Sequence, residues 1–324
     1  MSRSRICVAA LALSLVSSFV AACSDDSSGT GAATSTGGSA SDGGSGGEGT
    51  GATSSTGEGA SSGEGGSSSG SGGSGGNGGT PAVTASPGCM TGNGLPEGEN
   101  TFDLADASRH YMLHLPNGYT KDKQWPLLLA LHPNGSNIDY WNGTSGPRNI
   151  RAQVENDAIL VVAESLTGDW RDDEPTDLAY IDQVIGDVEK ELCVDLGEIF
   201  SMGFSGGGSF SGLLGCVRDD IRAFASGGAV KYFEDTDCTL HTPAAWVTIG
   251  SGELVPERVA FREYWRERDG CMESSQATDP DPCVAYDGCD AATPMNYCQH
   301  GGGHEWPAFG TEAAWQFLKQ FVTE

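Results

Sequence analysis

The sequence predicts one α/β domain with a mostly parallel sheet and helices on both faces, and three observations lead to that prediction. Short apolar runs of the kind that form buried parallel strands recur after the first quarter of the chain. Segments with apolar residues at helical spacing lie between these runs. One run passes through a Gly-x-Ser-x-Gly pattern into a helical segment. In such sheets the chemistry lies at the carboxyl ends of the strands.

The elements can be placed in order along the chain. Alternating apolar and polar residues predict an early antiparallel strand over residues 109–115. The apolar runs predict buried parallel strands over residues 125–132, 158–163, 199–204 and 244–249. Helical spacing predicts helices over residues 178–192, 209–217, 258–268 and 311–322. Three of the strands end in loops that carry candidate site residues, at residues 132–135, 203–207 and 250–253.

Residues 203–207 form the Gly-x-Ser-x-Gly pattern, a nucleophile elbow in which Ser205 lies on a sharp turn between a strand and a helix. Flanking glycines are needed there because the turn is strained and the two backbones pass close together. The same pattern recurs around Ser45, Ser68 and Ser74, inside a tract of glycine and serine that cannot fold. Ser205 is therefore the candidate nucleophile.

A serine hydroxyl needs a histidine base, and that histidine needs a carboxylate that holds the correct tautomer. His304 follows three glycines just before the predicted C-terminal helix, so the chain order is serine, acid, histidine, as in α/β-hydrolases. We expect His304 to be the base. His300, on the other side of the glycine run, is the alternative. The glycines argue against a helix that would align both histidines on a metal ion.

The acid is expected in the loop that follows the strand at residues 244–249. Glu253 is the carboxylate in that loop, and Glu257 and Asp235 are the alternatives. A buried glutamate can accept the hydrogen bond from the imidazole as an aspartate does.

The oxyanion of a tetrahedral intermediate needs two preorganised N–H donors. Gly206 is expected to supply one, because it follows the nucleophile. Asn134 is expected to supply the other, because Pro133 has no N–H. An ordinary turn at residues 132–135 is the alternative.

The N-terminus predicts export and a lipid anchor. Arg3 and Arg5 precede an apolar run that ends in Val-Ala-Ala before Cys23, a pattern typical of a bacterial lipoprotein signal. We expect residues 1–22 to be removed, Cys23 to carry the lipid, and Ser24 to favour the outer membrane. An ordinary signal peptide and a secreted product are the alternative, and the run is too short to favour a membrane-spanning helix.

Residues 23–86 are almost entirely Gly, Ser, Thr and Ala, a composition that predicts a disordered linker. Residues 87–324 are long enough for one α/β domain with a full core. The net charge of −27 excludes nucleic acid as a partner, because like charges repel the phosphate backbone. The only membrane contact expected is the lipid itself.

The chain has ten cysteines. Cys7 leaves with the signal and Cys23 carries the lipid, so eight remain, an even number that predicts disulfides in an exported protein. Their pairing stays open. Neither a Cys-x-x-Cys pair nor metal-ligand spacing occurs, so we expect no metal and no other cofactor. The four cysteines from Cys271 to Cys298 are expected to pin the loop region that leads to His304.

Together these residues resemble the secreted esterase family that contains feruloyl esterases, acetylxylan esterases and short polyhydroxybutyrate depolymerases. Four segments carry the resemblance: residues 111–119, with Leu-Pro-Asn-Gly-Tyr; residues 177–182, ahead of Val194 and Asp195; the elbow; and residues 283–307, from Cys283 through Cys289 and Cys298 to His304 and Trp306. The chain departs from the family pattern at Pro133, where a glycine is usual, and at Glu253, where an aspartate is usual. The resemblance implies a disulfide-stabilised α/β-hydrolase fold.

The resemblance also implies hydrolysis of carboxylic esters on a plant-type polysaccharide such as xylan, or of a polyester. In the first reading Ser205 attacks the ester carbonyl, His304 relays the proton and Glu253 orients His304. A polyhydroxyalkanoate depolymerase with the same residues is one alternative. A lipoprotein that binds polysaccharide without turnover is the other. The serine, the histidine and the elbow glycines favour an enzyme.

Three tryptophans, Trp141, Trp170 and Trp306, are candidates for a wall that stacks on a sugar or an aryl group. Packing in the core is the alternative for each of them. Asp177 matches an acidic position of the family, and it also stands where it can cap a helix.

Overall fold

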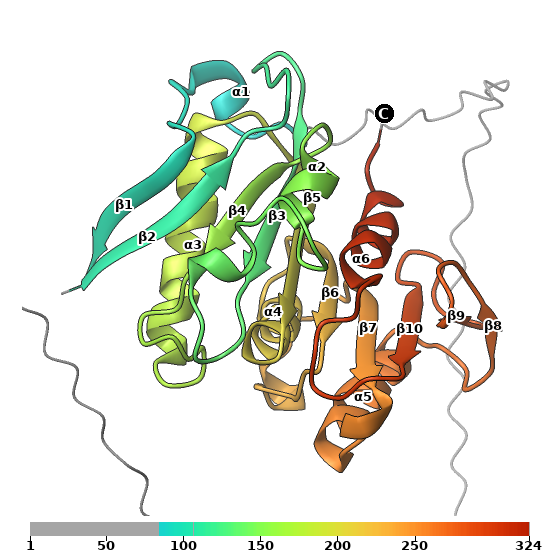
Figure 1. The fold of residues 1–324 in the computed structure, drawn as a ribbon. Helices are drawn as coiled ribbons and strands as arrows, with labels where there is room; N and C mark the ends of the chain where they lie inside the picture. The colour runs from blue at the N-terminus through green and yellow to red at the C-terminus, as the bar shows by residue number, and fades with distance from the viewer. Residues whose placement is uncertain (1–83, 106, 324) are drawn as a thin grey trace, which may run out of the picture. The chain divides into compact units, whose positions relative to one another are not determined.

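The computed structural model describes residues 84–105 and 107–323. Its centre is a ten-stranded sheet in the order β1-β2-β4-β3-β5-β6-β7-β10-β9-β8 (Figure 1). The strands are β1 Gly98–Leu104, β2 Ala107–His114, β3 Trp125–Leu131, β4 Ile159–Ala163, β5 Val194–Phe204, β6 Ile221–Gly227, β7 Ala244–Gly250, β8 Ser275–Ala277, β9 Cys283–Tyr286 and β10 Met295–His300. The strands from β4 to β10 in this order pair in parallel, and antiparallel strands extend the sheet at both ends. The predicted α/β-hydrolase sheet, mostly parallel with an early antiparallel strand, is confirmed.

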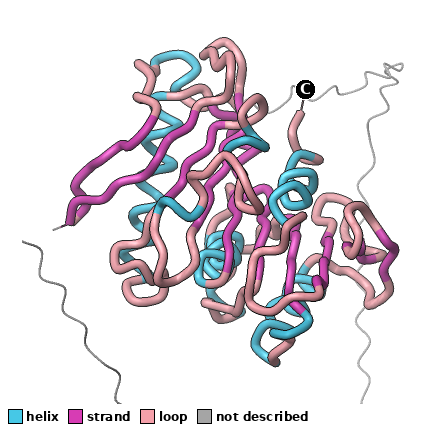
Figure 2. Tube along the Cα trace, viewed as in Figure 1, coloured by secondary structure: helices cyan, strands magenta, loops and turns pink. Residues whose placement is uncertain are grey.

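In the stretch from β3 to β6 an α-helix lies between each strand and the next. Figure 2 shows the helices and strands in separate colours. They are α1 Gly88–Thr91, α2 Ile150–Val154, α3 Glu174–Glu191, α4 Gly206–Val217, α5 Pro256–Arg268 and α6 Gly310–Lys319, with short 3-10 turns η1 Ile138–Tyr140, η2 Asp235–Asp237 and η3 Ser251–Glu253. No helix in the described part of the chain is both long and apolar enough to span a bilayer.

The apolar runs are continuous because the central strands are buried on both faces. In β3, Leu127, Leu129 and Leu131 pack into one cluster with the apolar sides of α3, α4 and α5. The intervening Leu128 and Ala130 pack into a second cluster with α2 and α6. The helices therefore cover both faces, as predicted.

Four disulfides join Cys89 to Cys193, Cys216 to Cys238, Cys271 to Cys289, and Cys283 to Cys298. Cys283 and Cys298 face each other across the paired strands β9 and β10. Because β10 runs directly into the loop that carries His304, the expectation that these cysteines pin that region is confirmed.

The folded part begins earlier than the predicted boundary at residue 87. Ala85 pairs with Asp195, and the fully buried Ser86 donates its hydroxyl to the Leu192 carbonyl. Small polar residues look alike in a linker and in a packed segment, so the sequence alone places this boundary only to within a few residues. The predicted signal peptide, Cys23 and the linker up to residue 83 lie outside the described residues.

Candidate active site

Ser205 lies in a strained turn between the end of β5 and the start of α4. Its φ of 55° is unusual for a residue with a side chain. The turn depends on its glycines, since a Cβ on Gly203 would come within 2.3 Å of the Gly207 backbone. A Cβ on Gly207 would come within 2.2 Å of the Leu131 carbonyl oxygen. The elbow thus holds a serine at the carboxyl edge of the sheet, where only glycine fits beside it.

His304 reaches Ser205 from the loop between β10 and α6. Its Nε2 lies 2.8 Å from the Ser205 Oγ. The imidazole packs against Gly228, where a Cβ would come within 2.8 Å of His304 Cε1, and Gly228 also has a positive φ of 58°. The imidazole ring centre is 4.8 Å from that of Phe204. The alternative, His300, is buried in β10, and its Nδ1 accepts a hydrogen bond from the Gly302 N–H.

Glu253 completes the hydrogen-bonded chain from the other side of the imidazole. Its Oε2 accepts a hydrogen bond from His304 Nδ1, and its Oε1 accepts one from the Gly250 N–H at 3.1 Å. Because an ionised carboxylate only accepts, the proton lies on Nδ1, which leaves Nε2 free to accept from the Ser205 hydroxyl. The two alternatives lie elsewhere, since Glu257 is exposed and Asp235 pairs with Lys231.

Arg258, in the first turn of α5, is a charged neighbour that the sequence analysis did not identify. Its Nε lies 3.1 Å from Glu253 Oε2 and donates to the Gly228 carbonyl at 3.0 Å. Its Nη2 is 3.2 Å from His304 Nδ1. Burial of Glu253 alone would raise its pKa, but the hydrogen bonds from His304 and Gly250 and the charge of Arg258 outweigh burial and lower the pKa below its ordinary value. Glu253 is therefore held ionised.

The two expected oxyanion donors lie next to each other. Gly206 is the first residue of α4, and a Cβ on it would come within 1.7 Å of Asn134 Oδ1, so the Asn134 side chain packs directly against it. Among the described residues, neither the Gly206 nor the Asn134 main-chain N–H donates a hydrogen bond within the protein. Their role as oxyanion donors remains a prediction.

Comparisons with known proteins give the chemistry a context. No family model matches the chain. Feruloyl esterase C of Emericella nidulans is 28% identical over 258 residues, which cover 72% of this chain and 90% of that protein. Feruloyl esterase D of Neurospora crassa is 26% identical over 274 residues, which cover 74% and 93%. The chain is therefore similar to feruloyl esterases over most of its folded part, and it is a carboxylic ester hydrolase.

Solved structures agree with this esterase in fold. Acetyl xylan esterase from Aspergillus awamori aligns with a TM-score of 0.52 and 14% identity, covering 69% of the esterase and 99% of that chain. A ferulic acid esterase from Anaeromyces mucronatus, solved with ferulic acid, aligns with a TM-score of 0.50 and 14% identity, covering 68% and 88%. These likenesses concern the fold alone.

The predicted stacking wall of tryptophans is wrong for this esterase. Trp141 and Trp170 have no exposed surface, and Trp306 keeps 7% of its surface. Each indole N–H donates to an acceptor inside the fold. Trp306 packs edge-on against Trp141, with ring centres 5.0 Å apart, and also contacts Phe204. A sugar can stack only on an exposed ring face, so these rings serve as packing beneath the elbow.

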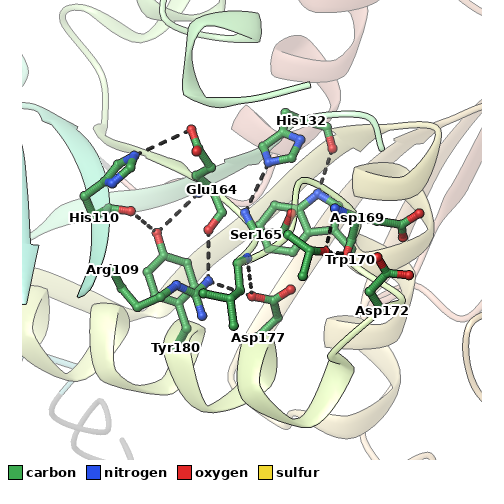
Figure 3. A network of polar contacts seen from close by, with 12 residues as sticks. Arg109, His110, His132, Glu164, Ser165, Asp169, Trp170, Asp172, Asp177 and Tyr180 are labelled. Atoms are coloured by element: carbon green, nitrogen blue, oxygen red, sulfur yellow. Dashed lines mark hydrogen bonds and ion pairs between the residues drawn. The ribbon is translucent and has the colours of Figure 1, made fainter. Parts of the chain in front are cut away.

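Asp177 is part of a buried ion pair, and the alternative that it caps a helix is also wrong. It lies inside α3, whose N-cap is Asp173, and its own N–H donates to the Asp173 carbonyl. Its Oδ1 accepts hydrogen bonds from Arg109 Nη2 at 2.6 Å and from the Leu166 N–H at 3.1 Å (Figure 3). The pair anchors the loop that follows β4.

Replacing Arg258 with glutamine tests how Glu253 is kept ionised. A carboxyl group whose pKa is lowered by folding contributes stability that is present above its ordinary pKa and is lost as the pH falls through the lowered value. Removing the guanidinium charge brings the pKa of Glu253 back toward its ordinary value and removes part of this contribution. We therefore expect Arg258→Gln to have a lower Tm than the parent at neutral pH, and the gap to narrow as the pH falls below 4.5.

Thermal unfolding between about pH 7 and pH 3 measures this gap. Arg258→Lys, which keeps the charge, should lie between the parent and Arg258→Gln. Arg222→Gln is the control for the loss of a guanidinium, since Arg222 lies over the Phe321 ring and its removal should give a gap that does not change with pH. A gap that is constant across the whole range would mean that Arg258 acts through its bond to the Gly228 carbonyl and not through the charge of Glu253.

Proposed function

We propose that the esterase removes feruloyl or acetyl groups from a plant polysaccharide such as xylan, with Ser205 as nucleophile, His304 as base and Glu253 as the orienting acid. The observation that carries this proposal is the continuous hydrogen-bonded chain from the Ser205 hydroxyl through His304 to Glu253 at a nucleophile elbow. The curated relatives are named feruloyl esterases, which supports an aromatic acyl group as the substrate class.

The proposed reaction proceeds through an acyl-enzyme. Ser205 Oγ attacks the ester carbonyl while its proton moves to His304 Nε2. The N–H groups of Gly206 and Asn134 stabilise the negative oxygen of the tetrahedral intermediate. His304 then gives the proton to the departing sugar oxygen, and the acyl group remains on Ser205. Water attacks this ester while His304 takes its proton, and His304 then returns that proton to Ser205 Oγ as the bond to the acyl group breaks and the carboxylic acid leaves.

Glu253 has a distinct task in this scheme. As His304 gains a proton at Nε2, the imidazolium carries a positive charge next to the Glu253 carboxylate, which stabilises it. The same carboxylate keeps the other proton on Nδ1, so His304 begins each step in the tautomer that can accept from Ser205.

We also propose that the esterase acts outside the cell, tethered by a lipid on Cys23 through the linker at residues 23–86, or secreted. The disulfides support an oxidising compartment. The lipid would be its only contact with a membrane.

Product release by the full mature chain tests the substrate class. We expect release of ferulate from feruloylated arabinoxylan or of acetate from acetylated xylan, and loss of that release in Ser205→Ala. Hydroxybutyrate released from polyhydroxybutyrate instead would favour the polyester alternative. Binding to xylan without release from any of the three polymers, by folded protein, would contradict the proposed enzyme.

A further inference from the structure

Two loops lie side by side at the carboxyl ends of the neighbouring strands β3 and β4, and hydrogen bonds join them. Residues 132–135 form the first loop, and residues 164–172 form the second. The Ser165 N–H donates to His132 Nε2 at 3.1 Å, and the Trp170 indole donates to the His132 carbonyl at 2.7 Å (Figure 3). The Gly135 N–H donates to the Gly168 carbonyl at 2.7 Å. The first loop is therefore bound to the second at both of its ends.

The Asn134 side chain ties the middle of the first loop. Its Nδ2 donates to Asp169 Oδ1 at 2.6 Å and to Tyr232 Oη at 3.1 Å. Its Oδ1 accepts from the Trp170 N–H at 3.2 Å. Both ends of the amide are thus occupied, and Pro133 fixes the backbone on the preceding side.

The second loop is itself held firmly. The buried pair of Arg109 and Asp177 forms hydrogen bonds to the start of this loop. Arg109 donates to the Glu164 carbonyl at 2.9 Å, and Asp177 accepts from the Leu166 N–H (Figure 3). At the other end, Asp169 Oδ1 also accepts from the Arg171 N–H at 2.9 Å. Asp169 therefore offers Asn134 an acceptor whose own position is set by the loop.

We propose that Asp169 is a positioning residue for ester hydrolysis: through the Asn134 side chain it holds the Asn134 N–H where the oxyanion forms. This inference rests on the proposed function. Asn134 needs such a support because Pro133 has no N–H, so that the oxyanion donor in this loop is the N–H of the next residue, Asn134. A donor in a loop must be fixed before the reaction, because a shift of about 1 Å costs on the order of 100-fold in rate.

The variants are Asp169→Ala, Asp169→Asn and Asp172→Ala. Asp169→Ala removes the acceptor, and we expect kcat to fall by about 10- to 100-fold with KM changed by less than about threefold. Asp169→Asn keeps an acceptor oxygen and should retain most of the activity. Asp172, exposed in the same loop, accepts a hydrogen bond from the Thr167 hydroxyl, and Asp172→Ala should behave like the parent.

Two readouts separate positioning from a general loss of structure. Stoichiometric labelling of Ser205 by an aryl phosphonate counts the working sites, so kcat is expressed per labelled site. Phenylboronic acid forms a tetrahedral adduct on a serine, and its affinity should fall with kcat in Asp169→Ala, while the affinity for the product ferulate stays at the parent value. Asn134→Ala, which leaves Asp169 in place, should reproduce both losses and serves if Asp169→Ala does not fold.

The inference is overturned if the parent is active and Asp169→Ala and Asn134→Ala have parental kcat per labelled site. It is also overturned if boronate and ferulate affinities fall together. A parent that labels but hydrolyses no ester would contradict the proposed function instead, so the two failures are distinguishable.

Discussion

Replacing His304 with glutamine is expected to lower kcat by about 10⁶-fold, because no other group can take the proton of the Ser205 hydroxyl. The imidazole is the only base within hydrogen-bond reach of Ser205 Oγ among the described residues. The measurement is the hydrolysis of a p-nitrophenyl ester under saturating conditions, with protein shown to be folded by circular dichroism.

His300→Gln is the matched control for this experiment. His300 bonds the Gly302 N–H from within β10, so its replacement should alter stability more than kcat. If His300→Gln lost activity and His304→Gln kept it, the assignment of the base would be wrong.

Replacing Glu253 with glutamine is expected to lower kcat by about 10³- to 10⁴-fold while the geometry of the loop is kept. Glutamine has the same shape, but its NH₂ group can donate to Nδ1 and so favours the tautomer with the proton on Nε2. In that tautomer the imidazole can no longer accept from Ser205. Removal of the negative charge also leaves the imidazolium without its partner.

Glu257→Gln serves as the comparison, because Glu257 is exposed at the start of α5 and was an alternative for the acid. It should have parental kcat. A Glu253→Gln variant within about tenfold of the parent would show that the carboxylate contributes little, which would contradict the mechanism.

Much of the sheet was predictable because its central strands are buried on both faces. The continuous apolar runs of β3, β4 and β7 are typical of buried parallel strands, and their predicted positions agree with the structure to within a residue or two. Strand β6 was missed, since Arg222, Ser226 and Gly227 interrupt its apolar pattern. Strand β10 was missed because Asn296 and Gln299 interrupt the pattern of apolar residues that would indicate a strand.

The residues of the site that lie in local sequence patterns could be predicted. The elbow around Ser205 and the glycine run before His304 are local patterns, and the structure brings both residues together with Glu253. Arg258 and Asp169 were missed, because their contacts depend on how α5 meets the end of β7 and how two loops pack. The tryptophans were misassigned, since sequence alone does not separate an exposed indole from a buried one.

The central claim is that Ser205 forms a covalent acyl-enzyme, and phosphonate labelling tests it most directly. The folded mature chain is treated with an aryl phosphonate ester, its intact mass is measured and the labelled peptide is identified. We expect one adduct per chain, on Ser205, with activity lost in proportion to labelling and no adduct on Ser205→Ala. Folded protein that takes up no label, or that keeps its activity when fully labelled, would contradict the claim.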